Sequence, residues 1–211
     1  DLFKRMASVW TQIGSDIDGE AASGQFGYSV SLSADGSVVA IGAPGGDDTF
    51  GRVQIYQNIN NTWTKIGNIV GENLSSWAGQ SVSLSADGSI VLINLRGFNS
   101  FSRSRVFIYQ NVNGSWISIG EEADNIYHSN SVSLSADGSV VALGRGNSVR
   151  IAQNVSGYWT QVGSLIEGFS NTLHGKDVSL SDDGSVVAIG NWVDDGNGVN
   201  SGHAKIYQNI N

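Results

Sequence analysis

The sequence predicts an all-β fold, namely a four-bladed β-propeller built from four-stranded antiparallel blades. A near-identical nonapeptide recurs through the chain, a Trp precedes each copy, and helical periodicity is absent. The nonapeptide reads SVSLSADGS at 29–37, 81–89 and 131–139 and DVSLSDDGS at 177–185, and the tryptophans are Trp10, Trp63, Trp116 and Trp159. A repeat of roughly fifty residues is typical of folds in which each repeat is one supersecondary unit.

Each nonapeptide begins a predicted β-hairpin. In the first repeat, residues 28–33 alternate apolar and small polar side chains, which is the period-two pattern of a strand. The Ala-Asp-Gly sequence at 34–36 supplies turn residues, and the β-branched run at 37–41 suits a strand buried on both faces. The same hairpin is predicted at 81–93, 131–143 and 177–189. The expected core contains the counterparts, in every repeat, of Val30, Leu32, Val39 and Ile41.

A third and a fourth strand complete each predicted blade. The third strands are expected at 52–56, 105–109, 148–152 and 204–207, and the fourth strands begin at a Trp. The chain opens with a fourth-strand motif, WTQIG at 10–14, and ends on a third strand and its turn. We therefore expect the Trp10 strand to complete the last blade and close the ring, which would protect the sheet edges. An excised part of a larger ring is the alternative.

The repeats define the domain organisation, and the composition limits the classes of partner that we expect. Residues 1–9 are assigned to an N-terminal extension and residues 10–211 to a single propeller of four repeats. The net charge of −8, with only 11 Lys and Arg, argues against a nucleic-acid partner. The chain has no Cys, which excludes disulfides and cysteine-based metal or nucleophile chemistry. No apolar run approaches the ~18–20 residues of a membrane span, so membrane insertion is not expected.

The stretch FGYSVSLSADGSVVAIGAP at 26–44 resembles the FG-GAP repeat of integrin-α-type β-propellers. The letters FG fall at 26–27 and GAP at 42–44, and the whole unit is similar to repeats of large secreted microbial surface proteins. This resemblance implies a secreted or cell-surface propeller with a role in adhesion or ligand binding. Integrin-type blades often carry a calcium loop, whereas this chain has a turn with the single carboxylate of Asp35. We therefore expect no metal and no cofactor.

Positions that vary between the repeats are the candidate binding positions. Two residues before the first-strand valine, the repeats carry Tyr28, Gln80, Asn130 and Lys176 in turn. This position opens the strand that would line the central channel of a propeller. Variable residues on a repetitive scaffold are where function is commonly found, and neutral drift of the repeats is the alternative.

Aromatic residues and histidines outside the repeated positions are further candidates. Trp77 and Trp192 are the best candidates for stacking on a sugar ring. His128 and His174 occupy equivalent positions, four residues before the first-strand valine, where the first repeat has Phe26. We expect these histidines to pack as Phe26 does and to lie near each other without a carboxylate, rather than to bind a metal.

The leading functional hypothesis is a non-catalytic extracellular binding or adhesion module whose partner is a glycan or a surface protein. A structural repeat domain of a surface or filament protein, which would self-associate, is the alternative. A second alternative is a hydrolase or lyase at the channel mouth, around Lys176, His128, His174 and the loop acids. We expect no enzyme, because there is no G-x-S-x-G motif and the paired acids are adjacent in sequence rather than placed across a substrate.

Overall fold

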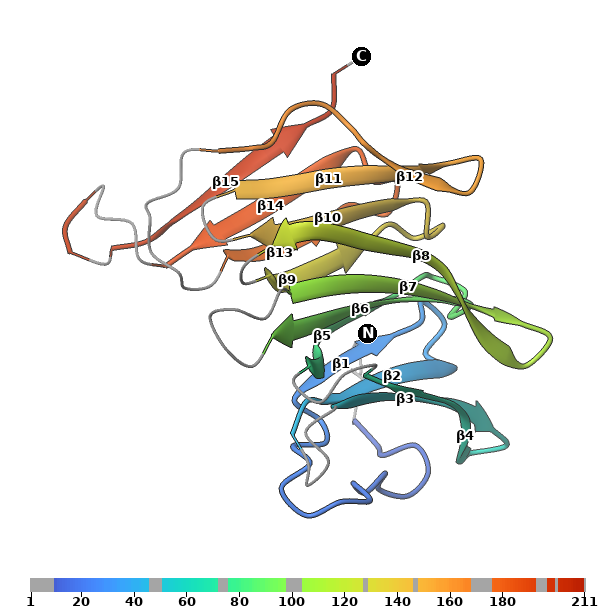
Figure 1. Ribbon diagram of the computed structural model, residues 1–211. Helices are drawn as coiled ribbons and strands as arrows, with labels where there is room; N and C mark the ends of the chain where they lie inside the picture. The colour runs from blue at the N-terminus through green and yellow to red at the C-terminus, as the bar shows by residue number, and fades with distance from the viewer. Residues whose placement is uncertain are drawn as a thin grey trace, which may run out of the picture.

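The computed structural model contains four antiparallel β-sheets that follow one another along the chain (Figure 1). It describes residues 10–45, 51–71, 76–97, 104–126, 129–145, 148–167, 176–192, 197–199 and 201–210. These residues form strands, turns and loops but no helix, so none of them provides a helix able to cross a membrane. The all-β prediction is confirmed.

The four sheets, here called A to D, are successive meanders, in which each strand pairs with its neighbour in the chain. Sheet A consists of β1 (Ser29–Leu32), β2 (Val38–Ala43), β3 (Arg52–Ile59) and β4 (Thr62–Val70). Sheet B consists of β5 (Ser76–Leu84), β6 (Ile90–Gly97), β7 (Ser104–Val112) and β8 (Ser115–Ile126). Sheet C consists of β9 (Ser129–Leu134), β10 (Val140–Arg145), β11 (Ser148–Val155) and β12 (Tyr158–Gln161). Sheet D consists of β13 (Lys176–Leu180), β14 (Val186–Asn191) and β15 (His203–Gln208).

The repeated Ser-x-Asp-Gly-Ser segment forms the same turn in every sheet. In sheet C, the Asp137 carboxylate accepts hydrogen bonds from the Ser135 hydroxyl at 2.7 Å and from the Ser139 amide at 2.9 Å. The Ser135 hydroxyl in turn accepts a bond from the amide of Val140, the first residue of β10. This turn fixes the register of the hairpin, for example Val132 opposite Leu143. The four predicted hairpins are confirmed.

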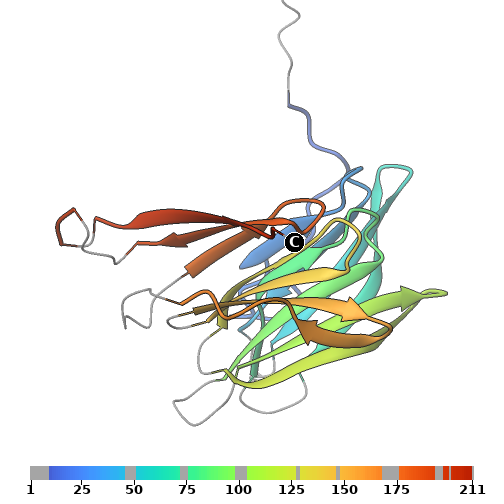
Figure 2. The ribbon, with the colours of Figure 1, turned by 90° about the horizontal axis from the view of Figure 1, so that it is seen from above.

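Neighbouring sheets are joined at their first strands. Strand β5 lies against β1 and β9, and β13 lies against β9. Viewed from above, the sheets fan out instead of lying in one plane (Figure 2). A chain of backbone hydrogen bonds links the turns: the amide of Ala34 donates to Ala86, Ala86 to Ala136, and Ala136 to Asp182, at 2.7–2.8 Å.

The hydrophobic core is divided among the three gaps between neighbouring sheets. One cluster joins sheets A and B, a second joins B and C, and a third joins C and D. Ile55 of β3 lies in the gap between sheets A and B, and Ile108 of β7 lies in the gap between sheets B and C. Both residues are completely buried. Trp116 and Trp159 pack against the first and second clusters from the fourth strands. Each sheet therefore depends on its neighbours for burial of its apolar faces.

The predicted closure of the ring is wrong in this structure. Sheet D has three strands, and Trp10 is 99% exposed rather than paired with β15. The N-terminal segment lies over sheet A instead, where the Trp63 indole donates to the Ile13 carbonyl at 2.9 Å and Lys65 forms an ion pair with Glu20. These contacts hold the segment at the end of the molecule opposite sheet D.

The predicted core is also wrong at one end. Val30 and Leu32 are 65% and 57% exposed, whereas their counterparts Val82 and Leu84 in sheet B are 8% and 7% exposed. The difference arises because sheet A packs on the face of sheet B that carries Val82. Within the described part of the chain, no sheet packs on the face of sheet A that carries Val30. Ile41 is buried as predicted.

Candidate functional site

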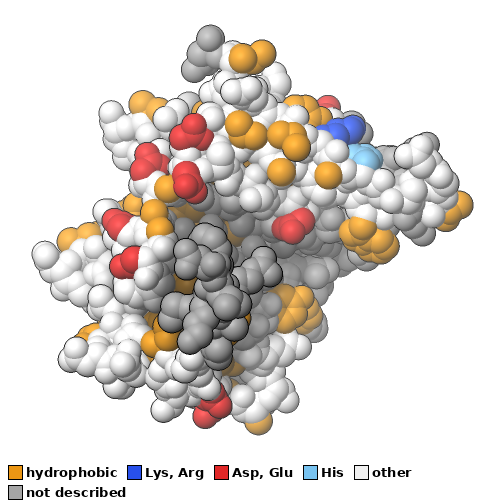
Figure 3. All heavy atoms as spheres, turned by 180° about the vertical axis from the view of Figure 1, so that it is seen from behind, with side chains coloured by type: hydrophobic (Ala, Val, Ile, Leu, Met, Phe, Trp, Pro, Cys, Tyr) orange, Lys and Arg blue, Asp and Glu red, His pale blue; other side chains and the backbone are white. Residues whose placement is uncertain are grey.

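Basic residues gather where the second strand of each sheet ends and the third begins. We call this the basic end. It is formed by Arg52, Arg105, Arg145, Lys176 and His203, each at the first, second or last position of its strand. The four turn aspartates Asp35, Asp87, Asp137 and Asp183 lie at the opposite end of the sheets. On one face of the molecule, a Lys or Arg and a His side chain lie together on the side away from a group of acidic side chains (Figure 3).

In sheet D the basic end is a row across three strands. Lys176 of β13 is opposite Asn191 of β14, which is opposite His203 of β15. Asn191 is buried and His203 is half-buried. Side chains of directly opposite residues project to the same face of a sheet, so the Asn191 amide and the His203 imidazole are neighbours. Asp177 follows Lys176 and accepts a 2.8 Å hydrogen bond from the Ser131 hydroxyl of sheet C.

In sheet A a polar network lies beside Arg52. The Tyr56 hydroxyl donates to the Gln54 side chain at 3.0 Å, and Gln54 donates to Glu20 at 3.1 Å. The hydrogen bond from Lys65 is the main cause that lowers the pKa of the Glu20 carboxyl, with a smaller contribution from the charge of Arg52. Burial raises the pKa of Tyr56. In sheet B the Arg105 guanidinium lies 4.8 Å from the centre of the Phe107 ring, which restricts its position by a cation–π contact.

The four variable positions singled out from the sequence all lie at the basic end. Tyr28 is exposed immediately before β1, Gln80 is half-buried in β5, Asn130 is in β9, and Lys176 begins β13. The role in ligand binding that was expected of these four residues stays a prediction.

The remaining predicted residues are dispersed or undescribed. Trp77 is half-buried in β5 opposite Arg96, and Trp192 is exposed directly after β14. His128 and His174 lie outside the described residues, so their predicted proximity stays a prediction. Among the described residues, no three His, Cys, Asp or Glu side chains are grouped as a metal site would require.

Four members of the basic end were not predicted from the sequence, namely Arg52, Arg105, Arg145 and His203. A usable signal was present for Arg52, Arg105 and His203, because these three residues occupy the same position before the third-strand apolar residues of their repeats. Aligning the third strands as carefully as the first strands would have identified them. The strand register decides how close these third-strand residues lie to the variable positions of the first strands, and the register is visible only in the structure.

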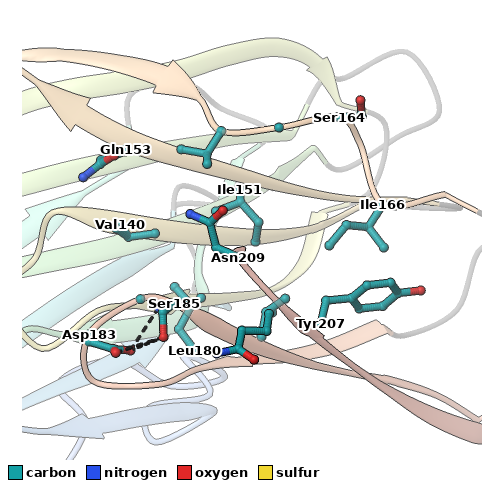
Figure 4. A pocket seen from close by; sticks show the side chains of 15 residues that line it. Val140, Ile151, Gln153, Ser164, Ile166, Leu180, Asp183, Ser185, Tyr207 and Asn209 are labelled. Atoms are coloured by element: carbon teal, nitrogen blue, oxygen red, sulfur yellow. Dashed lines mark hydrogen bonds between the residues drawn. The ribbon is translucent and has the colours of Figure 1, made fainter. Parts of the chain in front are cut away.

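A second feature is a cleft of about 370 Å³ between sheets C and D. Figure 4 shows Val140, Ile151 and Leu180 around it, with Asp183, Ser185 and Asn209 at its polar side. Hydrogen bonds from Ser181 and Ser185 lower the pKa of Asp183 to about 2. Because Asp183 is ionised and held by its own turn, it is a poor proton acceptor near neutral pH.

Comparison with known proteins gives a structural likeness but no family. No family model matches the chain, and no curated protein matches its sequence. Among solved structures, the chain is similar to a protein of Bacteroides fragilis with a provisional assignment as a 6-phosphogluconolactonase, at 16% identity and a TM-score of 0.50. The match covers 65% of this chain and 38% of that protein. At this identity the likeness concerns the fold.

The comparison overturns the leading functional expectation. A non-catalytic adhesion or glycan-binding module was expected, but the matched structure carries an enzymatic assignment. The alternative of a hydrolase at the channel mouth agrees better with this finding. The resemblance to FG-GAP repeats, and the secreted or cell-surface location that it implies, stay predictions.

Proposed function

We propose that the four sheets are blades of a β-propeller and that the chain is a hydrolase acting on anionic, sugar-derived lactones at the basic end. The observation that carries the proposal is the gathering of Arg52, Arg105, Arg145, Lys176 and His203, from four sheets, at one end of the molecule. The chain carries a net charge of −8, so a local concentration of cations suits an anionic ligand. The likeness to the assigned lactonase suggests the substrate class.

The residues of the basic end have the chemistry that this reaction needs. Guanidinium groups bind phosphate or carboxylate through paired N–H donors, which is the role we assign to Arg52 and Arg105. A neutral imidazole has a ring nitrogen that can accept a proton, so His203 is the candidate general base. Lys176 begins β13 at the other end of the same row, so its positive charge belongs to the basic end that would attract the anionic substrate.

The proposed reaction is the opening of a lactone ring by water. His203 takes a proton from a water molecule as its oxygen attacks the lactone carbonyl carbon. The bond between that carbon and the ring oxygen then breaks, and the ring oxygen receives the proton from His203. The product is the open-chain hydroxy acid, which is released as its carboxylate together with one proton. No oxidant or additional reactant takes part.

The test is hydrolysis of a phosphorylated sugar δ-lactone and of the same lactone without phosphate, followed by acid release at constant pH. We expect a rate above the uncatalysed reaction and a preference for the phosphorylated lactone. His203→Gln should reduce kcat by about 100-fold or more, as loss of a general base does. Lys176→Gln should raise the activation barrier for opening of the lactone ring. Lys205→Gln is the matched control, because it removes one charge from the same sheet outside the row.

Two results would contradict the proposal. One is a rate equal to the uncatalysed rate for both lactones. The other is catalysis that His203→Gln and Lys205→Gln reduce equally, since this would show that the row across sheet D is not the site.

A further inference from the structure

The tryptophan that joins neighbouring sheets lines a pocket beside its ring. Trp116 of β8 donates from its indole nitrogen to the Ile66 carbonyl of β4 at 3.2 Å. Trp116 and Tyr109 of sheet B line a pocket of about 430 Å³ together with residues 66–70 of sheet A. The residues that sheet A contributes to this pocket have the sequence Ile-Gly-Asn-Ile-Val and carry no charge.

The N-terminal segment, which lies beside sheet A (Figure 1), forms the equivalent pocket on that sheet. The Trp63 indole donates to the Ile13 carbonyl at 2.9 Å, as the Trp116 indole does to a carbonyl of the preceding repeat. Trp63 and Tyr56 line a pocket of about 280 Å³ together with residues 15–18 of the segment. This volume is close to the lower limit of about 300 Å³ for small-molecule sites, so its ligand must be small.

Two carboxylates distinguish the pocket on sheet A from the pocket in the next repeat. Asp16 and Asp18 both line it, and both residues are exposed. Alignment of the repeats on their tryptophans places Ile69 and Gly71 at the equivalent positions. The Gln12 side chain donates to Oδ1 of Asp16 at 2.7 Å, which restricts the position of that carboxylate. The pocket on sheet A therefore combines two aromatic rings with two negative charges.

The two aromatic side chains are fixed in place, and their polar groups are already bonded. The Tyr56 hydroxyl donates to the Gln54 side chain at 3.0 Å, and the Trp63 nitrogen donates to Ile13. Tyr56 is buried and Trp63 is half-buried. The rings therefore present π-surface to the pocket and no N–H or O–H donor, which suits a cation that is bound by ring faces.

The lysine beside this pocket is neutralised by another acid. Lys65 of β4 is opposite Tyr56 of β3 and forms an ion pair with Glu20. Within the described part of the chain, neither Asp16 nor Asp18 forms an ion pair. The charges of these two aspartates are therefore not offset by a basic side chain of the described residues.

We propose that this pocket binds a quaternary ammonium group, with its methyl groups against the two aromatic rings and its charge facing the two carboxylates. Cation–π attraction to Trp and Tyr faces is the usual way in which proteins bind such groups. A quaternary ammonium group has no N–H donor, so ring faces and opposite charge are the interactions that it can use. The net charge of −8 adds a general attraction for cations.

The pocket is separate from the basic end. Asn61 and Thr62, at the hairpin between β3 and β4, also line it. In the register of these strands the hairpin lies at the end of sheet A away from Arg52. Binding of the ammonium group therefore does not depend on the proposed hydrolase activity.

The experiment titrates the 211-residue chain at low salt with three ligands and follows each titration by nuclear magnetic resonance. The ligands are choline, ethanolamine, and the neutral analogue of choline in which carbon replaces the nitrogen. We expect choline to bind with a dissociation constant on the order of 1 mM. Ring currents should shift its methyl proton resonance upfield, an effect that carboxylates alone do not produce. Ethanolamine lacks the methyl groups and the neutral analogue lacks the charge, so each should bind at least about tenfold more weakly.

A charge variant tests the contribution of the carboxylates. Asp18→Asn should weaken choline binding about fivefold or more, as loss of a carboxylate about 4 Å from a cation does in water. Asp182→Asn is the matched control, because it removes the same charge from an exposed position of sheet D outside the pocket. Asp18 is exposed, so both variants should keep the wild-type circular dichroism spectrum.

Three outcomes would overturn the proposal. Choline would produce no upfield shift at ten times the expected dissociation constant, or ethanolamine or the neutral analogue would bind as tightly as choline. In the third outcome, Asp18→Asn and Asp182→Asn would bind choline equally well. Because the titration uses no lactone and the pocket lies outside the basic end, its failure and a failure of the lactone assay are distinguishable.

Discussion

The indole nitrogen of Trp63 donates a 2.9 Å hydrogen bond to the carbonyl oxygen of Ile13, and this bond reproduces the one that Trp116 makes with Ile66 in the next repeat. The N-terminal segment therefore occupies the place of a fourth strand beside sheet A without belonging to that sheet. Sheet D, at the other end of the series, has three strands among the described residues. The tryptophan contact that joins neighbouring repeats therefore extends to the N-terminal segment.

The glycine beneath each tryptophan is predicted to be essential for packing. A Cβ atom at Gly120 would approach the Trp159 ring to 2.3 Å, and overpacking of this kind costs about 1–3 kcal/mol. We expect Gly120→Ala to lower the free energy of unfolding by that amount in urea denaturation. Gly190→Ala is the control, because a Cβ atom there meets its nearest neighbours only at 4.0 Å. Equal losses in the two variants would show that the tryptophan contact is not the cause.

Equivalent leucines in sheets A and B are predicted to differ in their contribution to the stability of the single chain. Leu84 is buried between the two sheets, whereas Leu32 is exposed. Leu84→Ala should reduce the free energy of unfolding by about 2–5 kcal/mol, and Leu32→Ala by about 1 kcal/mol or less. Urea denaturation of both variants at low concentration measures the difference. A large effect of Leu32→Ala under these conditions would mean that another segment covers sheet A.

The turn aspartates predict how stability depends on pH. Hydrogen bonds from serine hydroxyls and amides hold the pKa of Asp183 at about 2, below the ordinary value of 3.8, and lower the pKa of Asp137 as well. A carboxyl whose pKa is lower in the folded state stabilises the fold above its unfolded pKa, and this stabilisation is lost as the pH falls through the folded value. Stability should therefore decrease as the pH falls from about 4 to about 2.

The urea midpoint measured across this pH range tests the prediction. The double variant Asp137→Asn/Asp183→Asn should be less stable than wild type near neutral pH and should lose less stability on acidification. Thr62→Ala changes an exposed, uncharged residue outside these turns and should follow the wild-type profile. An identical pH profile for the double variant and wild type would show that the turn hydrogen bonds do not stabilise the fold.

The features that were predicted correctly are those that depend on nearby residues. The hairpins follow from the alternation of residues 28–33 and the turn at 34–36, and the structure pairs Val30 with Ile41 as that pattern requires. Alignment of the repeats also gives Tyr28 and Lys176 equivalent positions in their repeats, and the ligand-binding role expected of them stays a prediction. Local pattern and turn chemistry are sufficient for these features.

The features that were not predicted depend on which repeats meet. Val30 and Val82 lie in identical nonapeptides, yet one is exposed and the other buried, because only one has a sheet on its valine face. Periodicity is the same whether the first and last repeats touch or remain apart, so it could not show that Trp10 lies away from β15. The cleft beside Gly163 follows from that separation and was equally invisible in the sequence.

The most direct test of the account compares lactone hydrolysis by the wild-type chain, His203→Gln and Lys205→Gln under the same conditions. We expect the wild-type chain and Lys205→Gln to hydrolyse the phosphorylated δ-lactone at similar rates, and His203→Gln to be slower by about 100-fold or more. A wild-type rate equal to the uncatalysed rate, or equal losses in the two variants, would contradict the proposed site.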